Sequence, residues 1–417
     1  MAKIKDINSR EILDSRGLPT LETTVILDND TIGTASIPSG ASTGIHEALE
    51  LRDHDEKRYK GKGVLKAVAN VRDKILPLLK GIEVTKQEDI DRKMIEADGT
   101  LNKSNFGANS ILSVSLASAR AASFSTHLPL YRYIKEFLAE NTDYIFVTPM
   151  FNVINGGLHG SGNLSIQEFL LIPDKTKTYF ESLEMGAELY QQIKDYLKNH
   201  NLNYSIGDEG GFTPGFSENK EVLSLLRKII EKSKYRYAQD IYLGLDLAAS
   251  EFYKKNQYEI STGKFFSGDE FLDYLVNLQK EYEIFSMEDP LSQDDWEFWS
   301  MFMARIGNKI KIIGDDLLST NIKRLNKAIK MKAVNSVLIK PNQIGTLTET
   351  LAVIKRAKEA NFDIVISHRS GETSDDFIAD LAVGTGANFV KFGAPARGER
   401  VVKYNRLLKI YQDLQLV

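Results

Sequence analysis

The first forty residues carry the hydrophobic pattern of β-strands. The segment TLETTVILD, residues 20–28, alternates apolar and polar side chains over much of its length, and DND at 28–30 is typical of a turn. The pattern predicts an antiparallel three-stranded meander that ends near residue 36.

From Glu47 to about Glu140 the apolar residues follow a helical period instead, as in AVANVRDKILPLL (67–79) and GANSILSVSLASARAA (107–122). The second segment carries Ala and Ser at most positions, so its backbone can approach a neighbouring element closely. A sheet followed by helices predicts an N-terminal α+β domain, residues 1–138.

Beyond this point short apolar runs alternate with helical stretches. Runs without polar alternation are typical of strands buried on both faces, and strands that alternate with helices are typical of a parallel sheet. Eight such runs predict a C-terminal eight-stranded (β/α) barrel, residues 139–417, with its site at the C-terminal ends of the strands. The runs are FNVIN (151–155), EFLLIP (168–173), IYLGLD (241–246), IFSME (284–288), IKIIGD (310–315), SVLIK (336–340), DIVISH (363–368) and NFVK (388–391).

The composition narrows the classes of function. The 53 basic and 57 acidic residues give a formal charge of −4 with no long run of either sign, which argues against nucleic acid or an anionic membrane as the main partner. Cysteine is absent, so disulfides, thiol catalysis and Cys-ligated zinc are excluded. The charged N-terminus has no apolar core, and no stretch of about 18 apolar residues occurs, so we expect neither a signal peptide nor a membrane span. A cytoplasmic location follows, with a secondary surface or secreted pool left open.

Six of the eight predicted strands finish on an ionisable residue. In a barrel the ends of parallel strands converge on one rim, which is where barrel enzymes place their chemistry. Each acidic residue taken alone could instead cap the helix after its strand. A series of such residues is harder to explain as caps. The six residues are Asp246, Glu288, Asp315, Lys340, His368 and Lys391.

The three carboxylates of this series, Asp246, Glu288 and Asp315, form a hard oxygen site without a soft ligand, which suits Mg²⁺ better than zinc. Lys340 comes next along the chain. Beside a divalent cation and the ammonium of Lys391, the pKa of Lys340 is expected to fall, which would provide a neutral amine as a general base. A lysine that reaches out of the barrel mouth into water is the structural alternative.

A glycine-rich loop supplies a candidate acid. GDEGGFTP, residues 207–214, holds Asp208 and Glu209 among glycines, which allow a loop to approach the mouth closely. A carboxyl group held there with little water can keep its proton and act as an acid. A surface turn is the alternative, because Gly and Asp dominate turns.

Polar residues also flank the first two predicted strands of the barrel. INGGLHGSG, residues 154–162, places His159 after the first strand, and Gln167 and Glu168 precede the apolar residues of the second. A lone histidine is more often structural than catalytic, so His159 is a candidate site residue only because of its position after the first strand.

Two further loops have the composition of ligand-binding segments. SHRSGET, residues 367–373, brings together His368, Arg369 and Ser370, and a guanidinium beside hydroxyl and amide donors suits a phosphate or a carboxylate. A charged loop between a strand and a helix is the alternative. SGASTG, residues 39–44, contains only small residues before a predicted helix near His46, so it is either a linker or a lid that swings over the mouth.

Taken together, these motifs resemble those of the enolase family. The resemblance covers essentially the whole chain, in the family's order and spacing, and several of the motifs are individually specific. The matching segments are SGASTGIHEALELRD, NKSNFGANSILSVSLA, NVINGGLHG, QEF, GDEGGF, LDLAASEFY, MEDP, GDDL, LIKPNQIGTLTET, SHRSGET and DLAVGTGAN.

The resemblance implies a glycolytic lyase that reversibly dehydrates a small phosphorylated three-carbon substrate, 2-phosphoglycerate, to phosphoenolpyruvate. It implies that Lys340 removes the C2 proton and that Glu209, assisted by Glu168, donates a proton to the departing C3 hydroxide, with His159 in the same pocket. A lysine or histidine base that works with one or two Mg²⁺ ions is a known characteristic of the superfamily, and this pairing is taken from the family.

The resemblance also implies two Mg²⁺ ions per site. Asp246, Glu288 and Asp315 would hold the first, and Ser42 would hold the second together with the substrate phosphate. Closure of the loop around Ser42 would exclude water from the site. The implied substrate contacts are Lys391 for the carboxylate, Arg369 and Ser370 for the phosphate, and Gln167 and His368 as further residues of the pocket.

The chain departs from the family pattern at two places. HGSGN gives Gly160, Ser161 and Gly162 where the family usually has an alanine and, two residues after it, an asparagine, and Phe392 follows Lys391 where a small threonine is common. The first departure bears on the loop's motion and substrate contacts, and the second on packing of the eighth strand. Neither changes a proposed ligand or proton-transfer group.

Two rival interpretations remain. Other proton-abstracting members of the superfamily act on different carboxylates and commonly carry lysines on the second barrel strand, but EFLLIP has none. A non-catalytic surface-binding role is often linked to C-terminal lysines, whereas this chain ends in YQDLQLV, so such a role is kept as an addition to catalysis. The family is usually dimeric and sometimes octameric, so we expect a homo-oligomer.

Overall fold

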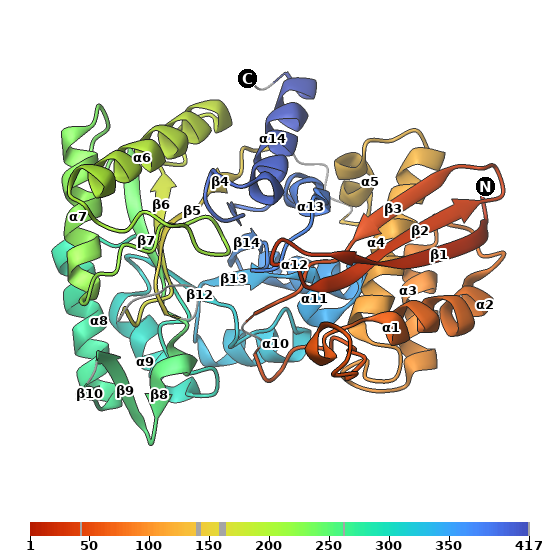
Figure 1. Cartoon of the computed structure of the whole chain (residues 1–417), viewed down its shortest axis with the longest axis horizontal. Helices are drawn as coiled ribbons and strands as arrows, with labels where there is room; N and C mark the ends of the chain where they lie inside the picture. The colour runs from red at the N-terminus through yellow and green to blue at the C-terminus, as the bar shows by residue number, and fades with distance from the viewer. Residues whose placement is uncertain (42–43, 139–142, 158–163, 262, 416–417) are drawn as a thin grey trace.

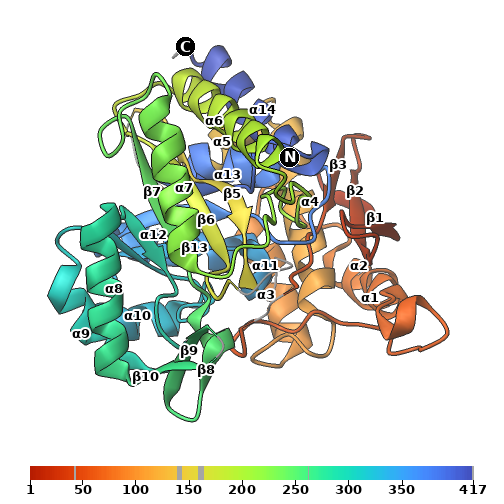
Figure 2. The same cartoon turned by 60° about the vertical axis from the view of Figure 1, so that its left-hand side comes forward.

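The structure is a computed structural model that describes residues 1–41, 44–138, 143–157, 164–261 and 263–415 (Figure 1). Figures 1 and 2 show two parts side by side: a small sheet with helices near the N-terminus, and a barrel surrounded by helices in the rest of the chain. The predicted α/β fold class is confirmed. The predicted division after residue 138 borders residues outside the described ranges and stays a prediction.

The N-terminal part begins with the predicted meander. Strands β1 (Ile4–Leu13), β2 (Pro19–Leu27) and β3 (Ile32–Ser36) form an antiparallel sheet in that order. The sheet packs on helix α4 (Ala108–Ser125), and a Cβ atom on Gly33 of β3 would lie 2.2 Å from the backbone nitrogen of Ala121. The close approach predicted from the small residues of this helix is therefore confirmed.

The remaining helices of this part are short, and one segment differs from the prediction. No helix begins near His46 within residues 44–58, because the backbone donors of this segment bond to distant groups: Ala48 donates to the Gln343 carbonyl and Leu49 to the Asn102 carbonyl. The helices are η1 (Tyr59–Gly61), α1 (Leu65–Asn70), the π-helical turn η2 (Val71–Ile75), α2 (Leu76–Leu79), α3 (Gln87–Asp98) and α5 (Leu130–Glu136).

All eight apolar runs of the second part form strands of one sheet. A short extra strand, β4, continues into β5, and the sheet closes where Met150 donates to the Val390 carbonyl and Asn152 donates to the Gly393 carbonyl. The strands are β4 (Thr148–Pro149), β5 (Phe151–Asn155), β6 (Glu168–Pro173), β7 (Ile241–Asp246), β11 (Ser286–Glu288), β12 (Lys311–Gly314), β13 (Ser336–Ile339), β14 (Asp363–Ser367) and β15 (Phe389–Lys391).

The prediction that all these strands run parallel is wrong for β6. This strand pairs antiparallel with both β5 and β7, whereas the pairs from β7 to β15 are parallel. The short, glycine-rich connection through residues 156–167 carries no helical pattern, and a parallel neighbour would need a longer crossover. The reversal puts the first residue of β6, Glu168, on the rim where the parallel strands end.

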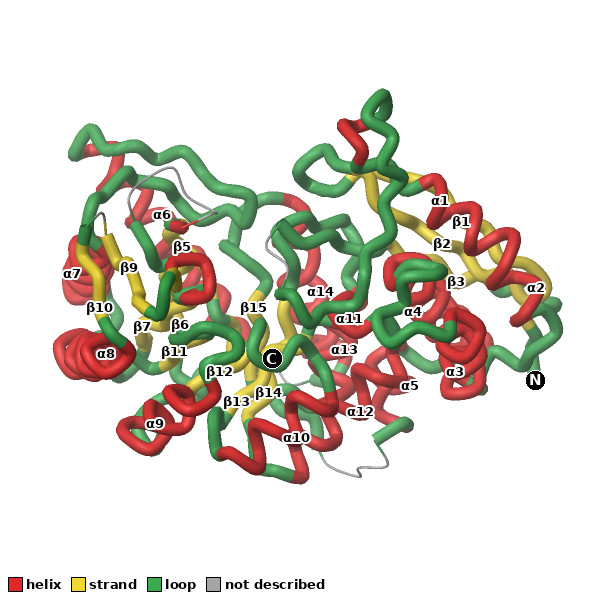
Figure 3. Tube along the Cα trace, turned by 90° about the horizontal axis from the view of Figure 1, so that it is seen from below, coloured by secondary structure: helices red, strands yellow, loops and turns green. Residues whose placement is uncertain are grey.

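Helices form a layer outside the strands, as Figure 3 shows for α7, α8, α9 and α10. A small antiparallel sheet of β8 (Tyr253–Lys254), β9 (Gln257–Ser261) and β10 (Lys264–Phe266) precedes α8, together with the turn η4 (Ala249–Phe252), and lengthens the connection from β7 to β11. The outer helices are α6 (Tyr179–Asn199), α7 (Asn219–Lys232), α8 (Gly268–Tyr282), α9 (Trp296–Ile306), α10 (Ile322–Met331), α11 (Pro341–Ile344), α12 (Leu347–Glu359), α13 (Phe377–Thr385) and α14 (Gly398–Asp413).

Apolar side chains fill the barrel and separate its two ends. The interior cluster consists of Met150, Leu170, Ile172, Ile313, Leu338, Val365 and Phe389, with Tyr242 and Phe285 packed against it. Within the described ranges, none of the helices combines the length and the apolar character needed to cross a membrane.

Candidate active site

A buried cluster of opposite charges lies at the C-terminal rim of the barrel. Strand pairing places Glu168 beside Asp246, and Asp246 beside Glu288. The Nζ atom of Lys391, at the end of β15, lies 3.0 Å from Asp246 Oδ2 and 2.8 Å from Glu288 Oε1. Its third carboxylate contact is Glu168 Oε2, at 3.2 Å. One ammonium group therefore bridges three carboxylates that come from three adjacent strands.

Burial controls the charge states in this cluster. It raises the pKa of Glu288 well above its usual value, and repulsion from Asp246 adds to the effect while Lys391 opposes it. Burial also raises the pKa of Glu168 well above its usual value, with repulsion from Glu209 as the next cause. For Lys391, burial would lower the pKa, but the surrounding carboxylates outweigh it and raise the pKa well above the usual value. The cluster thus favours a positive charge among its oxygens.

Lys340 forms a second ion pair on the rim. Its Nζ atom lies 2.5 Å from Asp315 Oδ2, and the other Asp315 oxygen accepts a hydrogen bond of 2.8 Å from Gln343 Nε2. Burial lowers the pKa of Lys340, but the Asp315 carboxylate outweighs burial and raises the pKa above its usual value. The lowered pKa predicted from the sequence is therefore wrong for this arrangement. The prediction considered the cations around Lys340 and omitted the carboxylate in contact with it.

A compact acidic group adjoins these ion pairs. Among the described residues, the ligand oxygens of Asp289, Asp315 and Asp316 all lie within 4.8 Å of one another. Asp289 also accepts hydrogen bonds from the backbone N–H groups of Asp315, at 2.9 Å, and Asp316, at 2.7 Å. Burial, together with repulsion from Asp315, raises the pKa of Asp316 to about 7. A cation would relieve this repulsion, so the group could hold a metal ion.

The three predicted metal ligands also have donor atoms that fit a hard cation. Glu288 Oε2 is buried and has no hydrogen-bond partner within the described part of the chain, while Oε1 faces Lys391. A buried carboxylate oxygen without a partner is costly unless a cation or water meets it. Asp246 directs Oδ2 to Lys391 and accepts from the Ala248 N–H with Oδ1. The donor atoms that these three residues offer are carboxylate oxygens, which is the ligand type that magnesium prefers.

The candidate acid Glu209 lies on the β5 side of the rim. It is buried, and its Oε2 atom accepts a hydrogen bond of 2.9 Å from Asn152 Nδ2 of β5. The carbonyl of Glu209 accepts from the Ala394 N–H after β15, which holds the loop against the barrel. The glycine-rich loop is therefore part of the mouth and not a surface turn.

His368 faces Glu209 as a neutral imidazole. Burial lowers the pKa of His368 well below its usual value. Arg400 Nη1 lies 2.5 Å from His368 Nδ1, and since a guanidinium can only donate, Nδ1 accepts and the ring proton resides on Nε2. That nitrogen is 3.6 Å from Glu209 Oε2. His368 therefore lies beside the Glu209 carboxyl group without adding charge to the site.

The N-terminal part meets the loop after β14. Arg369 forms a two-pronged ion pair with Glu47, with Nη1 at 2.8 Å from Oε2 and Nη2 at 3.1 Å from Oε1. Ser370 Oγ accepts from the Ala41 N–H at 2.7 Å, and Ser39 exchanges backbone hydrogen bonds with Gly371. The segment before residue 42 is thereby attached to the predicted phosphate-binding loop.

The rim encloses a small chamber of about 20 Å³, which is room for about one water molecule. The structure brings most of the predicted site residues together around it. The lining consists of Gln167, Glu168, Glu209, Asp246, Lys340, Ser367, His368, Arg369, Ser370 and Lys391.

The predicted metal ligands Glu288 and Asp315 border the chamber through their contacts with Lys391 and Lys340. Ser42 and His159, together with the HGSGN departure, lie outside the described residues. The other departure, Phe392, is fully buried and packs against Tyr404 with ring centroids 5.7 Å apart.

Sequence reasoning missed several residues of the site. Asp289 and Asp316 each follow a predicted ligand directly, in MEDP and GDDL, so their local signal was present. Asn152, Gln343 and Arg400 carry no such signal. Arg400 reaches the site from α14, near the end of the chain, and only the closed barrel brings it to His368.

The fold and the rim together define a barrel enzyme in which acidic, basic and cation-holding groups meet at one end. Residues 143–416 match the family model described as the enolase C-terminal TIM barrel domain, and residues 4–134 match the enolase N-terminal domain model. The chain therefore belongs to the enolase family and is a lyase-type enzyme of the enolase superfamily.

Proposed function

We propose that this chain catalyses the reversible, magnesium-dependent dehydration of 2-phosphoglycerate to phosphoenolpyruvate. The observation that carries the proposal is the single chamber lined by a half-buried lysine, Lys340, and two buried carboxyl groups, Glu168 and Glu209. Lys340 follows β13, and β6 with Glu168 lies four strands away in a closed eight-stranded barrel, across the mouth. Dehydration removes a proton from one carbon and a hydroxide from the next. This reaction requires a base on one side of the substrate and an acid on the other.

Lys340 is the proposed base that removes the C2 proton. Only a neutral amine can accept this proton, so the contact with Asp315, which raises the pKa of Lys340, has to be given up in the reacting enzyme. Gln343 Nε2 then remains as a hydrogen-bond donor to Asp315. The ion pair therefore belongs to the resting arrangement.

Glu209 is the proposed acid, with Glu168 in support. Burial raises the pKa of Glu168, which favours the protonated form of this carboxyl group. Asn152 Nδ2 orients Glu209 by donating to its Oε2 atom, and His368 Nε2 lies 3.6 Å from the same oxygen. The departing C3 hydroxide can leave as water once it receives a proton from this side of the chamber.

The proposed metal sites use the oxygen donors described above. Asp246, Glu288 and Asp315 would hold one Mg²⁺ ion, and Ser42, outside the described residues, is proposed for a second. When bound, the ions supply positive charge beside the substrate carboxylate, where negative charge develops. The ammonium of Lys391 would then turn from the protein carboxylates toward the substrate carboxylate.

Arg369 and Ser370 are proposed to hold the phosphate, and Gln167 to line the pocket. Arg369 is neutralised by Glu47, so phosphate binding requires this ion pair to open. The segment that carries Glu47 is joined to the loop of Arg369, and substrate binding would therefore change both together.

The test is a rise in enolpyruvate absorbance when 2-phosphoglycerate and Mg²⁺ are added to the purified protein. We expect the signal to disappear on chelation by EDTA and to return with added Mg²⁺. Absence of turnover with 2-phosphoglycerate, combined with turnover of an unphosphorylated hydroxy acid, would assign the chain to another reaction of the superfamily. A cytoplasmic location and assembly into a dimer or octamer stay predictions.

A further inference from the structure

A fully buried arginine, Arg400, joins two loops of the candidate site to helix α14. It lies in the first turn of this helix, where the positive end of the helix dipole disfavours a cation. Burial of the charge adds a further cost. The stability of the helix therefore does not account for an arginine at this position, whereas the contacts of its guanidinium group do.

The guanidinium group of Arg400 donates hydrogen bonds to backbone carbonyls of both loops. Nη1 donates to the Arg369 carbonyl at 2.6 Å, and Nη2 donates to the Ser370 carbonyl at 2.6 Å. Nη2 also donates to the Asp208 carbonyl at 3.1 Å. The first two carbonyls belong to the proposed phosphate-binding loop, and the third precedes Glu209, the proposed acid. One side chain thus holds the two loops together.

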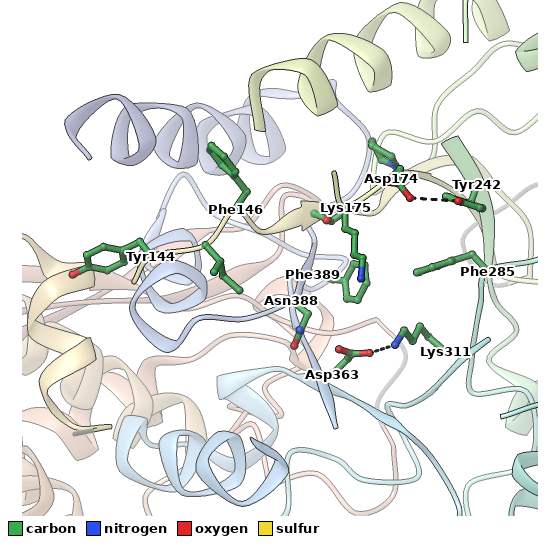
Figure 4. Close-up of a pocket in the computed structure, with 13 residues that line it drawn as sticks. Tyr144, Phe146, Asp174, Lys175, Tyr242, Phe285, Lys311, Asp363, Asn388 and Phe389 are labelled. Carbon is green, nitrogen blue, oxygen red and sulfur yellow. Dashed lines mark hydrogen bonds and ion pairs between the residues drawn. The ribbon is translucent and has the colours of Figure 1, made fainter. Parts of the chain in front are cut away.

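A buried arginine can also be compensated by direct contact with a carboxylate, as cations are at the opposite end of the barrel. A cavity of about 580 Å³ opens there, and Lys311 at this cavity is ion-paired with Asp363 (Figure 4). For Arg400, the carboxylate oxygen Glu399 Oε1 lies 3.5 Å from Nε, and Nε makes no hydrogen bond within the described part of the chain. The Nη donors are directed at the site instead.

A fourth contact of Arg400 fixes the position of the ring proton of His368. Nη1 lies 2.5 Å from His368 Nδ1, and a guanidinium can only donate, so the proton resides on Nε2. Nε2 lies 3.6 Å from Glu209 Oε2 and has no hydrogen-bond partner among the residues that the structure describes. A protonated Nε2 of a neutral imidazole cannot accept a proton from a carboxyl group.

Gly393, with φ of +88°, shows how closely these groups pack. A Cβ atom at this position would lie 2.7 Å from the Glu209 carbonyl oxygen and 3.1 Å from both Arg400 Cδ and His368 Cε1. Only a glycine leaves room for the three groups in this backbone conformation. The acid loop, the histidine and the arginine therefore meet at one point behind the chamber.

We propose that Arg400 is a positioning residue for the acid: by donating to His368 Nδ1, it keeps Nε2 protonated, so the imidazole cannot take up the acidic proton of Glu209. This proton then passes to the departing C3 hydroxide, which leaves as water, and His368 keeps its own proton. The other tautomer would present an unprotonated Nε2, which could hold the acidic proton in a hydrogen bond. The consequence for the reaction rests on the proposed function, whereas the tautomer is a property of the protein alone.

The first test measures the tautomer by NMR of the full chain labelled with ¹⁵N-histidine, which distinguishes protonated from unprotonated ring nitrogens. The His368 signals are identified by their absence in His368→Gln. We expect a proton on Nε2 in the wild type. In Arg400→Met, part of the population should carry the proton on Nδ1, because the nearby Arg369 and Ser370 carbonyls have lost their donor. A proton on Nδ1 in the wild type would overturn the proposal even if Arg400→Met did not fold.

The matched control is Lys403→Met, on the same face of α14 one turn further along. Lys403 is buried, donates to the Thr373 carbonyl at 3.1 Å and to a carbonyl of α14 at 2.8 Å, and lies 2.9 Å from Glu372 Oε2. It thus joins α14 to the same loop through other contacts. Its loss should lower the midpoint of urea unfolding and leave the His368 tautomer unchanged. An equal change of tautomer in both variants would show a general loosening of α14 and would overturn the proposal.

The second test compares two rates in one sample, dehydration of 2-phosphoglycerate and exchange of its C2 proton with solvent. Their ratio does not depend on the folded fraction of a variant. Arg400→Met should lower the ratio about tenfold or more, whereas Lys403→Met should keep the wild-type ratio. An unchanged ratio in Arg400→Met would overturn the role of the tautomer in the acid step. Absence of both rates in the wild type would instead contradict the proposed function, and the NMR measurement would still decide whether Arg400 sets the tautomer.

Discussion

At the scale of single residues, the rim holds its charges in pairs that the proposed reaction must rearrange. Lys340 is ion-paired with Asp315, Lys391 with three carboxylates, and Arg369 with Glu47. Each pair compensates a buried charge that would otherwise be costly. The functional groups are therefore stabilised by one another before any ligand arrives.

Lys340→Ala should lower turnover of 2-phosphoglycerate by about 10²- to 10⁴-fold, because no other group is proposed to accept the C2 proton. Exchange of the C2 proton with solvent, followed by NMR in deuterated water, should fall by a similar factor, whereas Mg²⁺ binding should persist. Lys355→Ala, at an exposed position of α12, is the control. Near-normal exchange in the Lys340 variant would show that another group is the base.

Glu209→Gln separates the two proton transfers. The amide retains the size of the side chain and can still accept from Asn152, but it cannot donate an acidic proton to the leaving hydroxide. We expect dehydration to slow by about 10²-fold or more while C2 exchange changes much less. If both rates fell equally, Glu209 would be needed for the first step, and its assignment as the acid would fail.

The sequence predicted the charged residues of the site better than their partners. The ionisable residues at strand ends stood out because each interrupts an apolar run, as Lys340 and Lys391 do. The contact between Lys340 and Asp315 could not be seen, since it depends on the side-chain geometry of two strands. This contact reverses the expected direction of the Lys340 pKa.

At the scale of elements, the reversed direction of β6 explains the position of Glu168. This residue begins its strand, yet it lies on the rim where the parallel strands end. Sequence reasoning identified all eight strands from their apolar runs, but apolar content does not encode direction. The direction follows from the connection, and residues 156–167 are too short and too rich in glycine for a crossover helix. Counting connection lengths would have predicted the reversal.

The contact between β3 and α4 gives a prediction for the N-terminal part. Gly33→Ala should destabilise the protein by about 1–3 kcal/mol, because the added methyl group would overlap the backbone of the helix and force the two elements apart. A Cβ atom there would lie 2.2 Å from Ala121 N and 2.4 Å from the Ala117 oxygen. Urea unfolding measures the change.

Gly398→Ala is the matched control, since a Cβ atom at Gly398 would have no neighbour within 4 Å. An unchanged free energy of unfolding for Gly33→Ala would mean that the sheet and helix can separate without cost.

At the scale of the whole molecule, buried polar contacts join the two parts. Asp91 of α3 is fully buried and accepts from the backbone N–H of Thr348, at 3.0 Å, and from its hydroxyl, at 2.6 Å. Gln87 donates to the other carboxylate oxygen at 3.1 Å. All of these partners are donors, so an amide at position 91 would place its NH₂ group against one of them.

Asp91→Asn should therefore lower the free energy of unfolding, with a cost of about 1–3 kcal/mol near pH 5. Burial raises the pKa of Asp91. A carboxyl group with a higher pKa in the folded state binds more protons when folded, so its contribution to stability decreases as pH rises above its unfolded pKa of about 3.9. The difference between wild type and variant in urea unfolding should therefore shrink as the pH rises. A difference that grows with pH would contradict this.

The chamber of about 20 Å³ has a kinetic consequence. A three-carbon phosphate ester occupies far more space, so the resting arrangement cannot admit it, and the ion pairs around the chamber have to separate first. Association would then include an opening step that does not depend on substrate concentration. In rapid-mixing experiments, the observed rate constant for binding should reach a plateau at high substrate concentration. The plateau value should equal the rate constant for spontaneous opening of the protein.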